Sequence, residues 1–193
     1  MCGISGILAS NETRSSELKK IAENMASILA HRGPDDSGVW LNSDNICVMS
    51  HSRLSVLDLS SAGSQPMTSK CGRYTIVFNG EIYNHNQLKS ELENQQVSQI
   101  IWKGHSDTEI LLAAIQKWSL KKALEKTVGM FAFGLWDHKE HSLSLARDRF
   151  GEKPLYFGWI DNKFAFASEL KAFNAFPNFT KKINEHALNL FFK

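Results

Sequence analysis

A cysteine at the second position of the chain is the residue with the clearest chemical potential. If Met1 is trimmed, as the small side chain of Cys2 should allow, Cys2 carries a thiol and a free α-amine on neighbouring carbons. The reference pKa is about 7.7–8.0 for the amine and about 8.5 for the thiol, so near neutral pH the amine can take the thiol proton. A nucleophile activated by its own terminal amine needs no histidine. Without the rest of the chain, Cys2 is equally well an ordinary small apolar residue.

Four further residues carry groups that acyl transfer requires. The side-chain amide of Asn79 and the backbone N–H of the adjacent Gly80 can converge on one point and stabilise an oxyanion. The guanidinium of Arg53 can hold a carboxylate through two hydrogen bonds, and the carboxylate of Asp107 can accept from an ammonium. Each has a simpler interpretation, namely a β-turn for Asn-Gly, a surface charge for the arginine and a helix cap for the aspartate.

Together these residues supply a thiol nucleophile, two oxyanion donors, a clamp for a carboxylate and a clamp for an ammonium. Such a set would hold a free α-amino acid by its zwitterionic end while the thiol attacks an acyl group in its side chain, and glutamine fits. A second interpretation is a hydrolase in which a histidine is the base to a cysteine, the candidates being His31, His51, His85 and His105. A third is a catalytically silent glutamine-sensing or regulatory module, which applies if Met1 is retained.

The composition excludes several other classes of protein. The 193 residues are 42% hydrophobic and 22% charged, as in a soluble globular domain, and the net charge of +2 comes from dispersed residues, unlike a nucleic-acid footprint. No apolar run approaches the roughly 18–20 residues of a membrane span, and no secretory signal is expected. The three cysteines lack a Cys-x-x-Cys pair, so neither disulfides nor a metal site are expected. Reduced thiols favour a cytoplasmic location.

Hydrophobic periodicity predicts the elements that position these residues. Apolar residues at positions 4, 7 and 8 predict a buried strand behind Cys2, and residues 15–30 predict an amphipathic helix that ends before Gly33 and Pro34. Early strands are expected over 39–41, 46–50, 53–57 and 74–78. The Asn79-Gly80 pair is expected to close the last of them with a turn. Helices are expected over 87–93 and 108–118, with Asp107 as N-cap of the second. Late strands are expected over 130–136, 142–146, 155–159 and 164–167.

The order of these elements predicts an α+β fold. Strands come first, two helices lie in the middle and strands follow, without the regular alternation that produces a doubly wound parallel sheet. We therefore expect a sandwich of two mainly antiparallel sheets with helices outside, which buries the face that carries Phe131, Phe133 and Leu135. No repeat, low-complexity tract or linker divides the chain, so residues 1–193 are expected to form one domain.

Seven short motifs, in a fixed order, resemble one enzyme family. They are Cys-Gly-Ile from Cys2, His-Arg-Gly-Pro-Asp from His31, Arg-Leu-Ser-Val-Leu-Asp from Arg53, Asn-Gly-Glu-Ile-Tyr-Asn from Asn79, Ser-Asp-Thr-Glu from Ser106, Gly-Met-Phe-Ala-Phe from Gly129 and Arg-Asp-Arg-Phe-Gly from Arg147. Over nearly the whole chain, this set resembles the class II glutamine amidotransferase domain of glutamine-hydrolysing asparagine synthetases. Glucosamine-6-phosphate synthase and amidophosphoribosyltransferase share the fold of that family but lack the third and fourth motifs.

The resemblance implies an N-terminal-nucleophile (Ntn) hydrolase fold, an αββα sandwich, and a role for each matching residue. Cys2 would be the nucleophile, and Asn79 with Gly80 would form the oxyanion hole. The α-amine of glutamine would lie near Glu81 and Asp107. The remaining substrate-binding residues would be Arg53, which takes the α-carboxylate, and the segment that lines the site, namely Leu54, Ser55, Val56 and Leu57.

The resemblance also implies a partner domain. In the family, ammonia passes through an internal tunnel to a C-terminal ATP-dependent synthetase domain, whose Ser-Gly-Gly-x-Asp-Ser pyrophosphate loop does not occur in this chain. We therefore expect a glutaminase domain separated from its synthetase, with no metal or cofactor of its own; ATP and Mg²⁺ are expected only in the synthetase domain. Aspartate is the default ammonia acceptor, and a polysaccharide precursor is the alternative.

Overall fold

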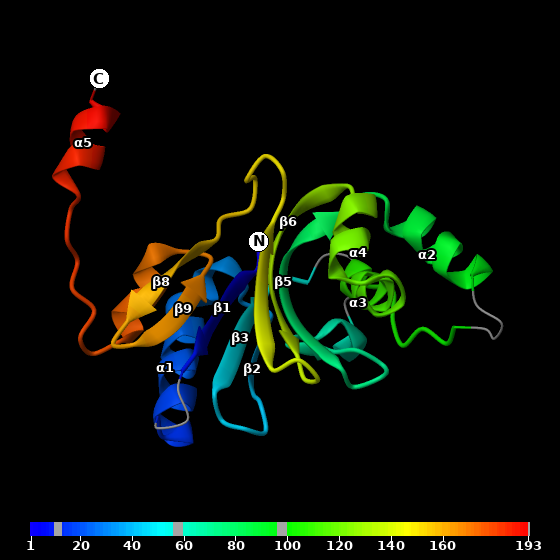
Figure 1. Ribbon diagram of the computed structural model, residues 1–193, viewed down its shortest axis with the longest axis horizontal. Coiled ribbons are helices and arrows are strands. Elements are labelled where there is room, and N and C mark those ends of the chain that lie inside the picture. Colours follow the sequence, from blue (N-terminus) through cyan, green and yellow to red (C-terminus); the bar gives the residue numbers. More distant parts are fainter. Residues whose placement is uncertain (10–12, 56–59, 96–99, 193) are drawn as a thin grey trace.

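Two antiparallel sheets packed face to face form the centre of the molecule, and helices cover both outer sides (Figure 1). The computed structural model describes residues 1–9, 13–55, 60–95 and 100–192. One sheet has the strand order β2-β3-β1-β9-β8 and the other the order β4-β5-β6-β7. The predicted fold class, an α+β sandwich of two antiparallel sheets flanked by helices, is therefore confirmed.

The first sheet is built around the strand that follows Cys2. This strand, β1 (Gly3–Leu8), pairs antiparallel with β3 (Cys47–Arg53) on one edge and with β9 (Lys163–Ala167) on the other. The outer strands are β2 (Asp36–Leu41) and β8 (Tyr156–Ile160). Because β1 has a partner on each edge, the backbone next to the N-terminus is held on both sides.

The second sheet consists of β4 (Met67–Thr68), β5 (Tyr74–Ile82), β6 (Gly129–Asp137) and β7 (Ser142–Arg147). Strands β5 and β6 pair along their whole length. The short β4 pairs only with the beginning of β5, at Thr75 and Ile76, so β4 does not cover the rest of that edge of β5.

The predicted turn at Asn79 and Gly80 is wrong. Both residues lie inside β5, opposite Ala132 and Phe131 of β6. An Asn-Gly pair favours a turn only through local backbone preference. Here the apolar residues of β5 and β6 pair on both sides of it, and this long-range pairing determines the conformation.

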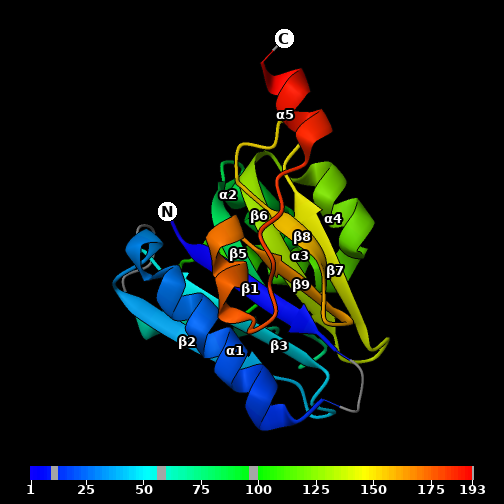
Figure 2. The ribbon, with the colours of Figure 1, turned by 90° about the vertical axis from the view of Figure 1, so that its left-hand side faces the viewer.

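Helices cover the outer faces of both sheets. Helix α1 (Ser15–Ile28) crosses the first sheet, beside the 3₁₀ helix η3 (Leu170–Ala175) (Figure 2). The second sheet is covered by α2 (His85–Asn94), α3 (Asp107–Trp118) and α4 (Leu120–Lys126). Helix α5 (Glu185–Phe191) projects from the body of the molecule and is exposed throughout (Figure 1). Within the described ranges, no helix combines the length and apolar character needed to span a bilayer.

Three local expectations differ from the structure. The helix expected over 15–30 ends at Ile28 and is followed by the 3₁₀ turn η1 (Ala30–Arg32). Strand β3 covers most of the strand expected over 46–50 and continues to Arg53, whereas Leu54 and Ser55 of the strand expected over 53–57 are not in a strand, and residues 56 and 57 lie outside the described residues. Ser106, and not Asp107, caps α3, because its hydroxyl accepts from the N–H of Glu109 at 3.2 Å. Helix α4 was not predicted.

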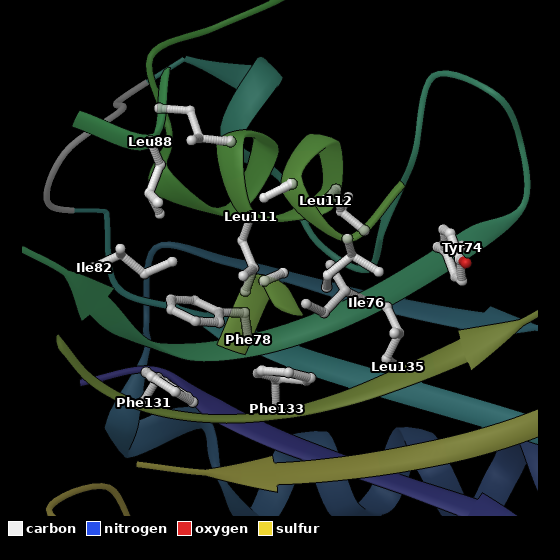
Figure 3. Close-up of a cluster of buried hydrophobic side chains, with 14 of the residues drawn as sticks. Tyr74, Ile76, Phe78, Ile82, Leu88, Leu111, Leu112, Phe131, Phe133 and Leu135 are labelled. Carbon is white, nitrogen blue, oxygen red and sulfur yellow. The ribbon is translucent and has the colours of Figure 1, made fainter. Parts of the chain in front are cut away.

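Each pair of layers encloses its own apolar cluster. Between the second sheet and its helices, the rings of Phe78, Phe131 and Phe133 stack with centroids 5.9–6.4 Å apart beneath Leu111 (Figure 3). The predicted burial of the face that contains Phe131, Phe133 and Leu135 is confirmed. A separate cluster fills the space between the two sheets. The strands are thereby fixed on both faces, which makes them a rigid support for groups at their ends.

Candidate active site

The predicted nucleophile and the predicted oxyanion donor project into the space between the two sheets. Ile4 is buried in the cluster between the sheets, and Cys2 lies two residues earlier on the same face, because side chains alternate along extended backbone. On the opposing sheet, Val77 belongs to the same cluster, and Asn79 follows it by two residues. The two side chains therefore approach the same space from opposite sheets.

At this end of the sandwich lies a cavity of about 230 Å³. A volume below the ~300–1,000 Å³ of sites for drug-sized ligands suits a molecule as small as an amino acid. Predicted site residues line it, namely Cys2, Arg53, Leu54, Ser55, Asn79, Gly80, Glu81 and Asp107. The other two predicted residues, Val56 and Leu57, lie outside the described residues. The structure thus brings together all the predicted site residues that it describes.

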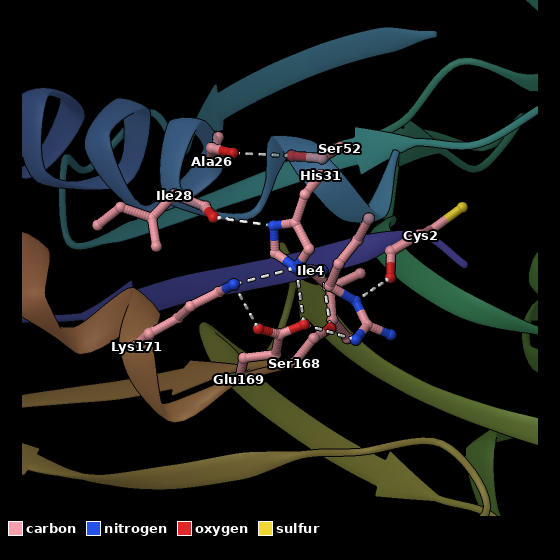
Figure 4. A network of polar contacts seen from close by, with 10 residues as sticks. Cys2, Ile4, Ala26, Ile28, His31, Ser52, Ser168, Glu169 and Lys171 are labelled. Carbon is pink, nitrogen blue, oxygen red and sulfur yellow. Dashed lines mark hydrogen bonds and ion pairs between the residues drawn. The ribbon is translucent and has the colours of Figure 1, made fainter. Parts of the chain in front are cut away.

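Cys2 is held by its backbone, whereas its thiol faces the cavity. The carbonyl oxygen of Cys2 accepts a hydrogen bond of 2.9 Å from Nε of Arg32. The thiol sulfur lies 3.4 Å from the backbone nitrogen of Leu54 and 3.6 Å from its carbonyl oxygen, distances typical of weak sulfur hydrogen bonds. In Figure 4 the sulfur of Cys2 points away from the polar network that holds the backbone. The nucleophile is therefore fixed without its sulfur being occupied by a strong partner.

That polar network centres on Glu169. Its carboxylate accepts from Arg32 at 2.8 Å and from His31 at 3.0 Å, and it forms an ion pair with Lys171 at 3.1 Å (Figure 4). Burial by itself would raise the pKa of Glu169, but the hydrogen bonds from Arg32, His31 and Lys171 outweigh it and lower the pKa to about 2. The carboxylate therefore stays ionised at neutral pH and fixes the arginine that holds Cys2. Glu169 was not predicted from the sequence, since Arg32 and His31, from which it accepts, are more than a hundred residues away along the chain.

Asn79 is a buried amide with an unsatisfied donor. Its side chain is 1% exposed, and Nδ2 has no hydrogen-bond partner among the described residues. A buried polar group without a partner destabilises a fold by roughly 1–3 kcal/mol. Such a group at the wall of a cavity is suited to a ligand atom that accepts a hydrogen bond.

Gly80 presents its backbone N–H at the uncovered edge of β5. Opposite Gly80 on β6, the carbonyl oxygen of Phe131 accepts from the backbone N–H of Asp148 at 2.8 Å, and the N–H of Phe131 donates to the carboxylate of Asp148 at 3.2 Å. Both backbone groups of Phe131 therefore point away from β5, and Gly80 and Phe131 form a non-hydrogen-bonded pair. The N–H of Gly80 therefore points away from β6, as do those of Phe78 and Ile82, which donate to side chains outside the sheet. This is the edge that β4 leaves uncovered.

Position 80 also requires glycine for a steric reason, which gives a prediction. A Cβ atom there would lie 2.3 Å from the carbonyl oxygen of Met130 and 2.6 Å from Cα of Phe131. We expect Gly80→Ala to lower the free energy of unfolding by about 1–3 kcal/mol, the usual effect of overpacking, as measured by chemical denaturation. Gly158→Ala is the matched control, because a Cβ at that strand position meets nothing within 4 Å. Equal stability of the two variants would contradict the close approach.

Opposite charges line the remainder of the cavity. Arg53 is 7% exposed, and its Nη1 donates to the carbonyl of Ser60 at 3.0 Å. Asp107 is also buried, and one carboxylate oxygen accepts from the N–H of Ile82 at 2.8 Å. Burial raises the pKa of Asp107 despite that hydrogen bond. Glu81 is half-buried beside Asn79 along the strand. A zwitterion would find both a cation and carboxylates on this wall.

Of the four histidines considered as bases, His51 is the one that lines the cavity. Burial lowers its pKa to about 4, and its Nε2 lies 3.1 Å from the carbonyl oxygen of Phe78. That nitrogen must carry the proton, because a carbonyl only accepts, and the lowered pKa keeps the ring neutral near pH 7. A base with a pKa this far below neutrality is a poor acceptor for a thiol proton. The Cys-His interpretation is weakened accordingly.

The part of the chain that the structure describes contains no cluster of side chains suited to a metal ion. There, no group of three or more His, Cys, Asp or Glu side chains has an arrangement that could hold a metal ion. The expectation that the domain needs neither a metal nor ATP stays a prediction.

Comparisons with known proteins agree with the geometry. A family model described as a glutamine amidotransferase domain matches residues 1–193. Asparagine synthetase [glutamine-hydrolyzing] 3 of Bacillus subtilis is 37% identical over 100% of this chain and 30% of its own length. Asparagine synthetase B of Escherichia coli is 37% identical over 89% of this chain and 30% of its own length. The chain therefore spans about a third of these relatives.

A solved structure supports the same fold. Glutamine phosphoribosylpyrophosphate amidotransferase from B. subtilis, solved with ADP and GMP, superposes with a TM-score of 0.71 at 23% identity, over 90% of this chain and 43% of that one. The structural likeness confirms the αββα fold implied by the sequence motifs, and the sequence relatives confirm the resemblance itself.

Proposed function

Because the chain belongs to the family of glutamine amidotransferase domains, we propose that it hydrolyses L-glutamine to glutamate and ammonia, with Cys2 as the nucleophile. The observation that carries this proposal is the buried Nδ2 of Asn79, which has no hydrogen-bond partner among the described residues and lies on the same cavity as the thiol of Cys2. A fold gains nothing from an unsatisfied donor. The donor becomes useful when a negatively charged oxygen develops beside it during a reaction.

The first half of the proposed cycle forms a thioester. After removal of Met1, the α-amine of Cys2 takes the thiol proton, directly or through a water molecule, and the thiolate attacks the side-chain amide carbon of glutamine. Asn79 and the N–H of Gly80 stabilise the oxyanion of the tetrahedral intermediate. The carbon–nitrogen bond then breaks, and the protonated amine returns its proton to the departing nitrogen, which leaves as ammonia.

The second half releases glutamate. A water molecule attacks the γ-glutamyl thioester while the same α-amine takes one of its protons. The oxyanion forms again at the same donors, because attack on the thioester produces the same type of tetrahedral centre. The carbon–sulfur bond breaks, the sulfur regains the proton and glutamate leaves. One terminal amine thus carries the proton in both halves, and no histidine is required.

Arg53 provides a test of how the substrate is held. If it takes the α-carboxylate, Arg53→Ala should raise KM for glutamine about 10–100-fold, because a hydrogen bond to a charged group is lost. The substitution should change kcat less. Steady-state kinetics measure both constants. The decarboxylated analogue of glutamine is the matched substrate, because its kcat/KM should not respond to the substitution. An effect confined to kcat would contradict the clamp.

The chemical state of the N-terminus distinguishes the proposed mechanism from two alternatives, a Cys-His hydrolase and a silent glutamine-binding module. Blocking the α-amine should stop hydrolysis by the proposed mechanism and should leave a Cys-His enzyme active. If Met1 is retained in the purified protein, Cys2 has no free amine, and the chain would be a silent glutamine-binding module. Intact mass spectrometry together with glutamate release from the same sample decides between these cases.

We also propose that the ammonia serves a synthetase domain in the full-length protein. The relatives of which this chain spans about 30% have names that describe glutamine-hydrolysing asparagine synthetases. Aspartate is accordingly the acceptor that we favour, and a polysaccharide precursor is the alternative. In this proposal the glutaminase half uses no cofactor, and ATP and Mg²⁺ act only in the synthetase half. A cytoplasmic location would keep the thiol of Cys2 reduced.

A further inference from the structure

Lys153 is a buried cation at the wall of the cavity that the proposed cycle does not use. The residue is 6% exposed, and it lines the cavity together with Cys2. Its Nζ lies 3.4 Å from the thioether sulfur of Met1, a weak acceptor. Within the described ranges, no carboxylate forms an ion pair with Lys153. Lysine is almost never buried without a charged partner, so this placement calls for a functional explanation.

A tightly bonded turn determines where Lys153 lies. The carboxylate of Asp148 accepts the backbone N–H groups of Phe131, Phe150, Glu152 and Lys153 at 2.9–3.2 Å. The guanidinium of Arg147 donates to the carbonyl oxygens of Gly151 and Lys153. Gly151 has a positive φ of 66°, and a Cβ there would lie 2.9 Å from the guanidinium carbon of Arg147. The Arg-Asp-Arg-Phe-Gly motif thus builds a rigid turn that delivers the lysine to the cavity.

We propose that Lys153 is a positioning residue that keeps the α-amine of Cys2 in its unprotonated, basic form. The inference rests on the proposed function. In this structure Nζ of Lys153 contacts the side chain of Met1, the residue that precedes Cys2. Removal of Met1 takes away that contact and leaves the ammonium of Lys153 on the wall of the same cavity as the new chain terminus. A nearby positive charge disfavours protonation of an amine and so lowers its pKa. More of the amine is then available to take the thiol proton.

The other titratable groups around the terminus are of both signs, and one of them is ion-paired. On the wall of the cavity or next to Cys2 are two arginines, two carboxylates and one histidine, namely Arg32, Arg53, Glu81, Asp107 and His51. The charge of Arg32 is paired with Glu169, and the guanidinium of Arg53 donates to a backbone carbonyl. The histidine is neutral, because burial lowers its pKa to about 4. Lys153 therefore supplies a positive charge without an ion-pair partner of its own among the described residues.

The test is the pH dependence of kcat/KM for glutamine in Lys153→Met and Lys153→Arg. Loss of the positive charge should raise the amine pKa, so in Lys153→Met the acidic limb should move to higher pH by about one unit. Activity near pH 6.5 would then fall about tenfold, with little change near pH 9. Lys153→Arg should retain the wild-type profile. An unchanged acidic limb in a folded Lys153→Met protein would overturn the proposal.

Two further measurements keep this test separate from the proposed function. Lys163→Met is the matched control: its side chain is 15% exposed and ion-paired with Glu17, at the end of β9 that lies beside Leu8 and away from Cys2, so its profile should be that of the wild type. The rate of N-terminal acylation by a succinimidyl ester, followed by peptide mass against pH without glutamine, reports the amine pKa directly. An acylation profile that is the same in wild type and Lys153→Met would overturn the inference. Absence of glutamine turnover in the wild type would overturn the proposed function alone.

Discussion

Replacing Cys2 by alanine is expected to abolish glutamine hydrolysis. Alanine is small enough for Met1 still to be removed, so the α-amine remains and only the sulfur is lost. The two halves of the proposed cycle both pass through a bond to that sulfur, and removal of a nucleophile typically costs at least ~10⁴-fold in kcat. Glutamate release, measured with the intact mass of the same sample, checks the result.

The matched control for this substitution is Cys71→Ala. Cys71 is exposed, its sulfur hydrogen-bonds with the hydroxyl of Ser69, and it is not part of the cavity lining, so its loss should leave turnover unchanged. Cys2→Ala should unfold close to the wild-type temperature, because the sulfur makes only weak contacts with the backbone of Leu54. Wild-type turnover in Cys2→Ala would refute the assignment of the nucleophile.

Replacing Asn79 by alanine should separate catalysis from stability. If its amide stabilises the oxyanion, Asn79→Ala should lower kcat about 10²–10³-fold, or ~3–4 kcal/mol, with a smaller change in KM. The free energy of unfolding should not fall by the amount usual for a buried hydrogen bond, because Nδ2 has no partner to lose among the described residues. Steady-state kinetics and chemical denaturation of the same preparation test both parts.

Asn42→Ala is the control variant for a buried asparagine with a purely structural role. Asn42 is equally buried, but its side-chain oxygen accepts from the N–H groups of Ile46 and Cys47 at 2.8–2.9 Å, and it is not part of the cavity lining. Its replacement should reduce stability and leave kcat unchanged. If Asn79→Ala behaved like Asn42→Ala, the oxyanion role would be wrong and the amide would be structural.

Much of the fold could be predicted from the sequence, because its core strands carry strong local patterns. Buried runs in β1 and β6 identify strands through their apolar residues alone. The failure at Asn79 and Gly80 has a physical cause: turn preference is local, whereas the conformation of β5 follows from pairing with β6, some fifty residues away along the chain. Helix α4 carries only one fully buried residue, which leaves little periodicity to detect.

The site was predictable only in part, for a related reason. Cys2, Asn79 and Arg53 carry recognisable chemistry, and the structure brings them to one cavity. Glu169 and Lys153 have side chains that are common on protein surfaces. Their importance comes from contacts with distant residues and, for Lys153, also from burial. Such contacts have no local pattern. The position of Lys153 two residues after the Arg-Asp-Arg-Phe-Gly motif was the signal that could have drawn attention to it.

The most direct test of the central claim is the mass of the protein quenched in acid during turnover. The account predicts a fraction of molecules that lack Met1 and carry one glutamyl group, which peptide analysis locates on the sulfur of Cys2 and hydroxylamine removes. The modification should disappear in Cys2→Ala and persist in Cys71→Ala. Rapid glutamate release from a protein that retains Met1, or a glutamyl group on any other residue, would contradict it.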